Sequence, residues 1–311
     1  MTIKYKQTIS TLLVLLIAVV TGVSVGKIYV DSLEVAPIVA ASEEALRAND
    51  DVEALVARAK FSSVTSFTPV ELYLIAEHNL NNSPEFYKIM TGTVYATLGI
   101  TQPMKGERLK TNGKLIYNKL SPSTSSFAPA ICSRVIYDYA TPDEVTVIPT
   151  GTFASTSPDL IGNFNSADAD VYTLDEYRET FNTFPTTVLP YIITSITCAD
   201  ADNISEVTDN GDDTYSFSIS LSGSSLAMAG LYYAYEIRFS SGMSDLPSWT
   251  SMTMEVTIDS SFNFVEISYN ETYRMNAPAI GMTPVTDEFV DRFYFDEETI
   301  QQAYEAIGEV Q

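Results

Sequence analysis

Residues that bind metals or act as nucleophiles are scarce in this sequence. The 311 residues include one histidine, His78, and two cysteines, Cys132 and Cys198. A Cys/His metal site needs more ligands than these, and a Ser-His-Asp or Cys-His arrangement would depend on His78 alone. No Gly-x-Ser-x-Gly elbow, phosphate-binding glycine loop or His-Glu-x-x-His motif occurs. We therefore expect a protein that is not an enzyme and holds no metal or other cofactor.

Positive charge is also scarce, and it is unevenly placed. The formal net charge is −23. Residues 1–120 carry 12 Lys or Arg and 11 Asp or Glu, whereas residues 121–311 carry 5 and 29. This acidic part repels phosphate backbones, so the sequence predicts no nucleic-acid partner. Strong acidity keeps a protein soluble in a salty setting outside the cytoplasm.

Charged residues are absent from residues 7–26, and Lys4 and Lys6 precede this stretch. Twenty uncharged residues in a helix span about 30 Å, the thickness of a bilayer core. The basic flank predicts a cytoplasmic N-terminus, with the bulk of the chain outside the cell membrane. A signal peptide cleaved after Gly26 or Ala41 is the alternative, and would give a secreted protein. We expect residues 1–30 to be this anchor or signal, 31–60 a connector and helix, and 61–311 one extracytoplasmic domain.

The clearest strand pattern lies between residues 212 and 275. Strict alternation of apolar and polar residues predicts strands at 214–221, 250–258 and 264–275, with a helix at 226–239 after the first. Strands with one apolar face need a layer over that face. The sequence therefore predicts an α+β fold, in which helices cover a broad, curved antiparallel sheet.

Turn and capping signals place the remaining elements. Thr68-Pro69-Val70-Glu71 and Thr173-Leu174-Asp175-Glu176 predict capped helix starts, and Asp296 is expected to cap a terminal helix that runs to about residue 307. A further helix is expected at 42–60. Further strands are expected at 86–101, 107–120, 131–139, 144–149 and 286–295, with connections at 102–106 and 276–286.

Two sets of side chains leave alternatives open. Export to an oxidising space would allow Cys132 and Cys198 to pair in a disulfide, and two buried thiols are the equal alternative. The basic residues Lys105, Arg108, Lys110 and Lys114 belong either to a solvated sheet face or to a surface that contacts anionic headgroups.

Several segments in this order resemble a known group of proteins. They include the strand Asp213-Thr214-Tyr215-Ser216-Phe217, the segment from Ser241 to Trp249, and Val256-Thr257-Ile258-Asp259. Together the segments resemble uncharacterised exported proteins of Gram-positive bacteria and, more remotely, the open half-barrels of the LolA and LppX lipoprotein carriers. The resemblance implies a curved sheet with helices on its concave face and acyl chains bound inside. This chain differs from the lipid-anchored members because no cysteine follows its apolar N-terminal segment.

Methionine and aromatic side chains mark the predicted ligand cavity. Such adaptable side chains either fill the core between helix and sheet or leave space for an acyl chain. The candidate residues are Met228, Leu231, Tyr232, Tyr235, Met252, Met254, Tyr269 and Tyr273. We expect a carrier of a lipid or other amphiphile at the cell envelope. The alternative is an envelope interaction or structural protein with a solid core.

Overall fold

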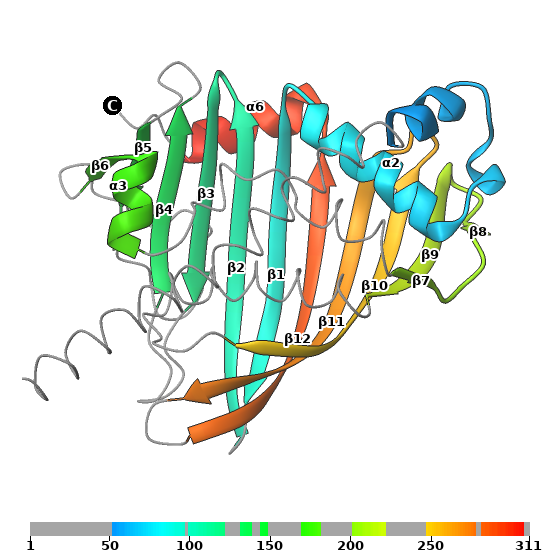
Figure 1. The fold of residues 1–311 in the computed structure, drawn as a ribbon. Coiled ribbons are helices and arrows are strands. Elements are labelled where there is room, and N and C mark those ends of the chain that lie inside the picture. Colours follow the sequence, from blue (N-terminus) through cyan, green and yellow to red (C-terminus); the bar gives the residue numbers. More distant parts are fainter. Residues whose placement is uncertain are drawn as a thin grey trace, which may run out of the picture.

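The computed structural model describes residues 52–96, 99–121, 131–138, 144–148, 169–181, 201–221, 247–277 and 281–307. These residues form one large, open, curved sheet with helices on both of its faces (Figure 1). The predicted curved antiparallel sheet is thus confirmed. The predicted membrane segment 7–26, the helix 226–239 and Cys198 lie outside the described residues. Among the residues that are described, no helix is long and apolar enough to cross a membrane.

The sheet has twelve strands, and every described pairing is antiparallel. Its order is β6-β5-β4-β3-β2-β1-β12-β11-β10-β9-β7, with β8 also paired to β9. The strands are β1 (Phe86–Ala96), β2 (Ile100–Thr111), β3 (Lys114–Ser121), β4 (Ile131–Asp138), β5 (Glu144–Ile148), β6 (Asp170–Thr173), β7 (Ala201–Asn203), β8 (Thr208–Asp209), β9 (Thr214–Leu221), β10 (Ser248–Asp259), β11 (Phe264–Ala277) and β12 (Gly281–Tyr294). Pairing of β1 with β12 joins the N-terminal and C-terminal strands at the middle of the sheet.

Two of the predicted strand boundaries are wrong. The expected connection at 102–106 lies inside β2, where Pro103 is opposite Thr93 of β1. The turn comes later, at Asn112-Gly113, where both residues have positive φ angles of 51° and 76°. An Asn-Gly pair favours this two-residue hairpin turn because both residues tolerate left-handed backbone angles. The expected loop at 276–286 is also shorter, because β11 continues to Ala277 and β12 begins at Gly281.

The helices begin where their capping residues predict. In α2 (Pro69–Asn82) the Thr68 hydroxyl accepts from the Glu71 backbone N–H at 3.3 Å, and the Glu71 carboxylate accepts from the Thr68 N–H at 2.8 Å. Thr173 makes the same arrangement with Glu176 before α3 (Leu174–Phe181). The Asp296 carboxylate accepts from the Thr299 N–H at 2.8 Å before α6 (Glu297–Ile307). A helix over 52–59 and a 3₁₀ turn, η1 (Val64–Ser66), precede α2.

Side chains divide the sheet into two faces that carry different helices. Phe86 of β1 packs in the cluster that contains α2 and Tyr177 of α3, whereas its neighbour Tyr87 packs with Ile300 of α6. We refer to these as the α2 face and the α6 face. The expectation that all helices share the concave face is therefore wrong for α6, which docks on the opposite side (Figure 1).

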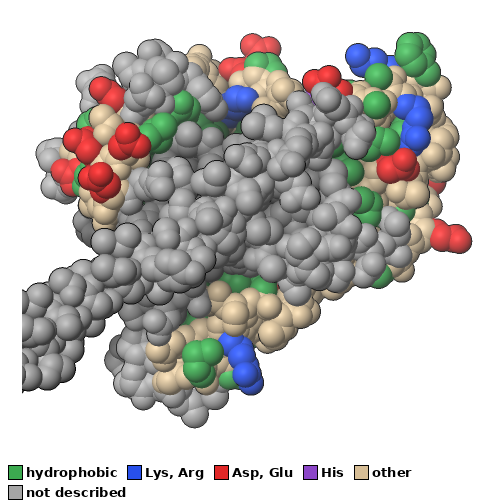
Figure 2. Space-filling view, viewed as in Figure 1, with side chains coloured by type: hydrophobic (Ala, Val, Ile, Leu, Met, Phe, Trp, Pro, Cys, Tyr) green, Lys and Arg blue, Asp and Glu red, His purple; other side chains and the backbone are tan. Residues whose placement is uncertain are grey.

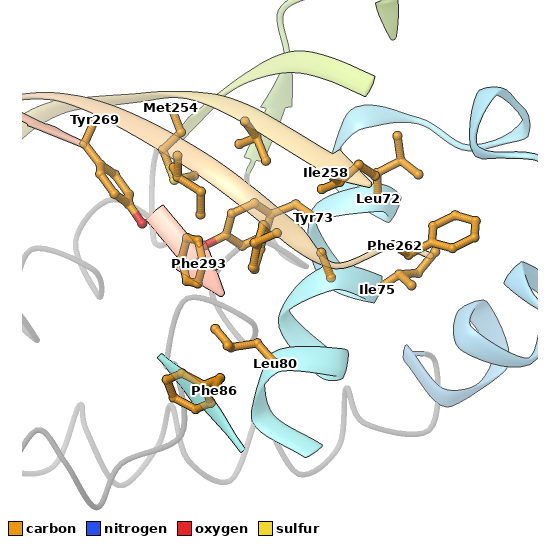
Figure 3. Close-up of a cluster of buried hydrophobic side chains, with 14 of the residues drawn as sticks. Leu72, Tyr73, Ile75, Leu80, Phe86, Met254, Ile258, Phe262, Tyr269 and Phe293 are labelled. Atoms are coloured by element: carbon orange, nitrogen blue, oxygen red, sulfur yellow. The ribbon is translucent and has the colours of Figure 1, made fainter. Parts of the chain in front are cut away.

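The main core lies between α2 and strands β9 to β12. Leu72, Tyr73 and Ile75 of α2 are at most 1% exposed, and they face Ile258, Phe262 and Phe293 (Figure 3). The rings of Tyr73 and Phe264 have centroids 5.2 Å apart. Each large apolar side chain buried in this way contributes about 1.5–3 kcal/mol. The helix therefore closes one end of the α2 face.

Candidate functional site

Four of the eight predicted cavity residues lie on described strands, and all four are on the α2 face. Met252 and Met254 of β10 are buried completely, and Tyr269 and Tyr273 of β11 are at most 4% exposed. Met254 lies directly opposite Tyr269 in the sheet register. The structure thus places these four side chains on one face of the sheet, and their role in a ligand cavity stays a prediction. Met228, Leu231, Tyr232 and Tyr235 lie outside the described residues.

Beside these apolar residues, the α2 face carries six buried charged side chains. We call them the ionic cluster. Each is no more than 8% exposed, and they come from five neighbouring strands: β3, β2, β1, β12 and β11. The cluster consists of Lys88, Arg108, Lys119, Glu271, Asp287 and Asp291. Burying so many ionisable groups is costly unless each is compensated.

The first part of the ionic cluster is a buried ion pair. Lys88 Nζ of β1 donates to Asp291 Oδ2 of β12 at 2.7 Å. The Tyr269 hydroxyl donates to the same oxygen at 3.3 Å. Arg108 lies directly opposite Lys88 on β2, and its guanidinium carbon is 5.6 Å from the centre of the Tyr117 ring. This part of the cluster is therefore compensated by close opposite charge and by aromatic contacts.

The second part is a pair of carboxyl groups. Glu271 of β11 lies directly opposite Asp287 of β12. Trp249 Nε1–H donates to Glu271 Oε2 at 2.7 Å, and the Tyr273 hydroxyl bonds Asp287. Burial, followed by the adjacent Glu271 charge, raises the pKa of Asp287 to about 8. Burial and the neighbouring Asp287 raise the pKa of Tyr273 well above its ordinary value.

Two glycines shape the sheet between the cationic and anionic sides of the cluster. Gly92 of β1 lies opposite Phe289, whose ring covers it so closely that an added Cβ would be 2.1 Å from Cδ1. Gly106 of β2 lies opposite Lys119 of β3. Neither glycine places a side chain on the α2 face. On the same face, Lys119 of β3 acts electrostatically on Asp287 of β12 and lowers its pKa, against the larger raising effects of burial and Glu271.

The four basic residues predicted to contact anionic surfaces do not share one surface. Arg108 and Lys110 lie on the α2 face, and Arg108 is only 6% exposed. Lys110 Nζ donates to the Asn81 carbonyl at 3.3 Å, and burial lowers its pKa. Lys105 is directly opposite Leu120 on the other face, and Lys114 lies at the start of β3. Arg108 is therefore buried within the fold, and contact of the other three residues with anionic headgroups stays a prediction.

The α6 face contains a separate buried polar network with a structural role. The Tyr87 hydroxyl donates to Glu107 Oε1 at 2.6 Å, and Asn118 Nδ2 donates to Glu107 Oε2 at 3.0 Å. Arg134 Nε donates to Asn118 Oδ1 at 2.8 Å, and its Nη1 donates to the Ile307 carbonyl at 3.3 Å. A cation at this carbonyl satisfies the C-terminal end of α6. The network therefore fixes α6 on the sheet.

The ionic cluster is the set of side chains that sequence reasoning missed. Its members are far apart in sequence, as Lys88 and Asp291 are, and only the pairing of β1 with β12 brings them together. The sequence does contain one signal for the cluster, because Asp287 and Asp291 are four residues apart in a strand and so lie on the same face. Within the described ranges, no group of three or more His, Cys, Asp or Glu side chains is placed to hold a metal ion.

Comparison with protein-family models finds no match, and comparison with curated proteins finds none either. Among solved structures, a LolA superfamily protein from Nitrosomonas europaea is similar at 9% identity and a TM-score of 0.25, over 75% of this chain and 97% of that chain. The protein Rv2717c of M. tuberculosis is similar at 10% identity and a TM-score of 0.20, over 70% and 96% of the two chains. Likenesses at such TM-scores carry no argument about function, which therefore has to be inferred from the side chains of this chain.

Proposed function

We propose that this protein is a non-enzymatic binding or carrier protein for a lipid or other amphiphile, held on the α2 face. The observation that carries this proposal is the composition of that face. Buried methionine and aromatic side chains on β10 and β11 adjoin the buried ionic cluster on β1, β2, β3, β11 and β12. An amphiphile has both an apolar chain and a polar head, and so matches both parts.

A solid core gives a poorer account of the ionic cluster. Replacing buried ions by apolar side chains of similar volume is often neutral or stabilising, so a face that only had to pack would not need them. Lys88 and Asp291 form an ion pair, whereas Glu271 and Asp287 are two buried carboxyl groups placed side by side, and burial together with Glu271 raises the pKa of Asp287 to about 8. Buried polar groups that a fold does not need for stability are candidates for ligand binding.

The proposal also includes the place where the protein works. The uncharged stretch 7–26 with its basic flank supports a membrane anchor or a secretion signal. The strongly acidic remainder supports an extracytoplasmic location, because acidic surface keeps the domain soluble near an anionic membrane. The amphiphile would then be bound or carried at the outer side of the cell membrane.

Native mass spectrometry tests the proposal directly. The full-length chain is purified from a lipid-containing host, and spectra are recorded before and after extraction with organic solvent. We expect a bound mass that disappears on extraction and returns when extracted lipids are added back. A clean apo mass, with no gain on titration with host lipids, would overturn the carrier function.

A second measurement places the ligand on the α2 face. Trp249 is the one tryptophan in the sequence, and it lies on this face beside Tyr273, at a ring-centroid distance of 4.5 Å. A fatty acid brominated on its chain should quench Trp249 fluorescence, while the same acid without bromine should not. Binding without quenching by bromine would place the ligand elsewhere on the protein.

The alternative function, an envelope interaction protein, has its own supporting observation. On the α6 face, strands β9 to β11 carry polar side chains that include Ser218, Glu255 and Asn270. Asn270 and Glu255 are exposed, and Ser218 Oγ bonds Glu255 Oε2. Such a surface suits a polar partner. A clean apo mass, combined with binding to wall polymer or to a surface protein, would favour this function.

A further inference from the structure

Two neighbouring hairpins carry no charged residue at one end of the sheet. Residues 89–104, which include the end of β1 and the start of β2, are all uncharged, and so are residues 275–286, which include the end of β11 and the start of β12. The two stretches adjoin each other, because Ala96 of β1 lies opposite Val285 of β12. In a chain with a net charge of −23, this end of the molecule is exceptional. We call it the uncharged end.

The β11–β12 hairpin extends past its neighbouring strands at the uncharged end. In the described pairings, β10 accompanies β11 only as far as Arg274, and β1 accompanies β12 only as far as Val285. Beyond these points β11 and β12 pair with each other, out to Ala277 opposite Gly281. The four residues Gly281–Pro284 of a strand span about 13 Å. The hairpin thus forms a two-stranded extension that curves away at the lower end of the sheet (Figure 1).

Large apolar side chains are exposed on this end. Met282 is 66% exposed and Tyr95 is 39% exposed. The Tyr95 hydroxyl donates to Glu288 Oε2 at 3.4 Å, so its polar tip has a partner while its ring borders solvent. Gly281 and Pro284 beside Met282 are exposed as well. Single exposed apolar residues are common, but here they belong to one continuous uncharged area, which is typical of an interaction surface.

On the strands of these two hairpins, the charges that border the uncharged end are mostly basic or buried. Arg274 is exposed and directly precedes the uncharged part of β11, and Lys105 directly follows that of β2. Asp287 follows the uncharged part of β12 but is only 3% exposed. The first exposed carboxylate on β12 is Glu288, six residues from Met282. Figure 2 shows hydrophobic and basic side chains at the lower end of the molecule, with no acidic side chain among the coloured atoms there.

The opposite end of the same sheet is acidic. Asp212 and Asp213 are exposed just before β9, and Asp259 ends β10. These two turns are adjacent, because the Ser260 N–H donates to the Asp213 carbonyl at 3.0 Å. Val265 is 36% exposed at this end, so both ends have exposed apolar side chains and differ in charge. An anionic surface would repel the acidic end and attract the basic border of the other.

We propose that the uncharged end docks on an anionic lipid membrane. Met282 and Tyr95 lie in the interfacial layer, where apolar side chains are buried and tyrosine is enriched. Arg274 lies at the level of the anionic headgroups. The outer edges of the β11–β12 extension have no strand partner among the described residues, and unpaired backbone groups are costly in hydrocarbon, so docking is shallow.

This membrane contact goes beyond the proposed function, because it requires no bound ligand. A second copy of the chain is a poorer occupant of the uncharged end. Association of two copies would bring together two molecules that each have a net charge of −23.

The experiment places one tryptophan at either end of the full-length protein. Met282→Trp reports on the uncharged end and Val265→Trp on the acidic end, both in a Trp249→Phe background so that a single tryptophan emits. Each variant is reconstituted into vesicles of phosphatidylcholine brominated on its chains, with or without phosphatidylglycerol. The two variants share the same residues 7–26, so any attachment through that stretch is equal in both. Thermal melting checks that they are equally folded.

We expect bromine to quench the tryptophan of Met282→Trp and to leave that of Val265→Trp unquenched. Bromine near the ester end of the chain should quench more than bromine near the methyl end, because docking is shallow. Phosphatidylglycerol should increase the quenching. Adding Arg274→Gln to Met282→Trp should lower the ratio of docked to undocked protein about fivefold on the anionic vesicles, since one basic residue near such a surface contributes a factor of about this size.

Arg292→Gln is the matched control for Arg274→Gln. Arg292 is also an exposed arginine of this sheet, but it lies ten residues from Met282 along β12 and pairs with Glu266 at 3.0 Å. Its replacement removes the same charge and should leave the quenching in Met282→Trp unchanged. Equal effects of the two arginine variants would overturn the role given to Arg274.

The outcomes separate membrane docking from ligand binding. No quenching in Met282→Trp, or equal quenching in both tryptophan variants, would overturn the docking. Equal quenching with and without phosphatidylglycerol would overturn the part played by charge. No quenching, together with a dimer that Met282→Trp weakens in ultracentrifugation, would overturn the docking in favour of a second copy. A clean apo mass together with quenching confined to Met282→Trp would overturn the carrier function and support the docking.

Discussion

A single buried carboxyl group can make the stability of a protein depend on pH. The pKa of Asp287 is raised to about 8 in the folded protein by burial and by Glu271, from an ordinary value of 3.8. Below both values the group is protonated in both states and has no effect. Between them, the unfolded chain ionises while the folded chain keeps its proton. The contribution of Asp287 to the unfolding free energy therefore falls as the pH rises from about 4 to about 8.

The prediction concerns Asp287→Asn. The amide cannot ionise and can still accept from the Tyr273 hydroxyl, so the variant should lose this pH dependence. We expect it to be equally or slightly less stable than the unaltered protein near pH 4, and more stable near pH 8. Urea denaturation at a series of pH values measures the difference. Parallel curves for the two proteins would contradict it, and Glu288→Gln should follow the unaltered protein throughout.

Gly92 gives a second prediction at the scale of one residue. A Cβ at this position would be 2.1 Å from Phe289 Cδ1 and 2.3 Å from the Glu288 carbonyl oxygen. Because one of these atoms is backbone, β1 and β12 would have to separate. Gly92→Ala should lower the unfolding free energy by about 1–3 kcal/mol, as overpacking does.

Gly106 is the matched control for this substitution. The nearest atom to its added Cβ is the terminal methyl of Met90, at 3.1 Å, and a methionine side chain can move aside. Gly106→Ala should therefore be much less destabilising in urea titrations. If both alanine variants lost the same unfolding free energy, the close contact of Phe289 with Gly92 would not be the reason that Gly92→Ala is destabilising.

At the scale of elements, local signals in the sequence predict helix starts better than strand ends. Thr68 and Thr173 are followed at the third position by a glutamate, and both helices begin as predicted. The capping bonds form within four residues, so no knowledge of the rest of the fold is needed. The alternation in β9, β10 and β11 is equally local, and those strands were predicted within a few residues.

Signals that depend on tertiary structure were harder to interpret. Pro103 and Gly106 predict a loop from their intrinsic preferences, yet both lie in β2. Pairing of both residues with β1, and of Gly106 also with Lys119 of β3, outweighs those preferences. The short pair Asn112-Gly113 was the correct turn signal, and its flanking residues Thr111 and Lys114 close the hairpin.

The ionic cluster could not be predicted from the sequence for a related reason. Strand β12 carries charges at Asp287, Glu288, Asp291 and Arg292, which point to both faces. Alternation therefore does not indicate which of them is buried. The decision comes from the pairing of β12 with β1 and β11, across long stretches of chain. The burial of the apolar residues Met252 and Met254 was easier to predict, because apolar and polar residues alternate along this part of β10 and all the apolar ones share one face.

The start of α2 allows a test at this scale. Thr68→Ala removes the hydroxyl that accepts from the Glu71 N–H, and the loss of an N-cap costs about 1 kcal/mol. Because α2 closes one end of the main core, we expect the full loss to appear in the global unfolding free energy. Thr68→Ser keeps the acceptor and should restore most of the stability. An alanine variant as stable as the serine variant would show that the cap contributes nothing to the fold.

At the scale of the whole molecule, one sheet joins regions of unlike charge. Strands β1 to β3 supply the three cations of the ionic cluster, and β11 and β12 supply its three anions. The contact of β1 with β12 therefore joins a basic and an acidic part of the sheet. Acidic side chains also gather around α3 at the edge of the molecule (Figure 2).

This imbalance predicts how salt acts on the folded protein. With a net charge of −23, repulsion within the compact state exceeds attraction, and dissolved ions screen charges that lie farther apart than about 10 Å at 0.1 M ionic strength. The buried pair of Lys88 with Asp291, at 2.7 Å, is screened much less. We therefore expect the melting temperature at pH 7 to rise as NaCl increases from about 10 mM to about 200 mM. Near the isoelectric point of about 4.2 the same salt range should have little effect, because the net charge is close to zero. A melting temperature that falls with NaCl at pH 7 would mean that ion pairs stabilise this fold more than its acidity destabilises it.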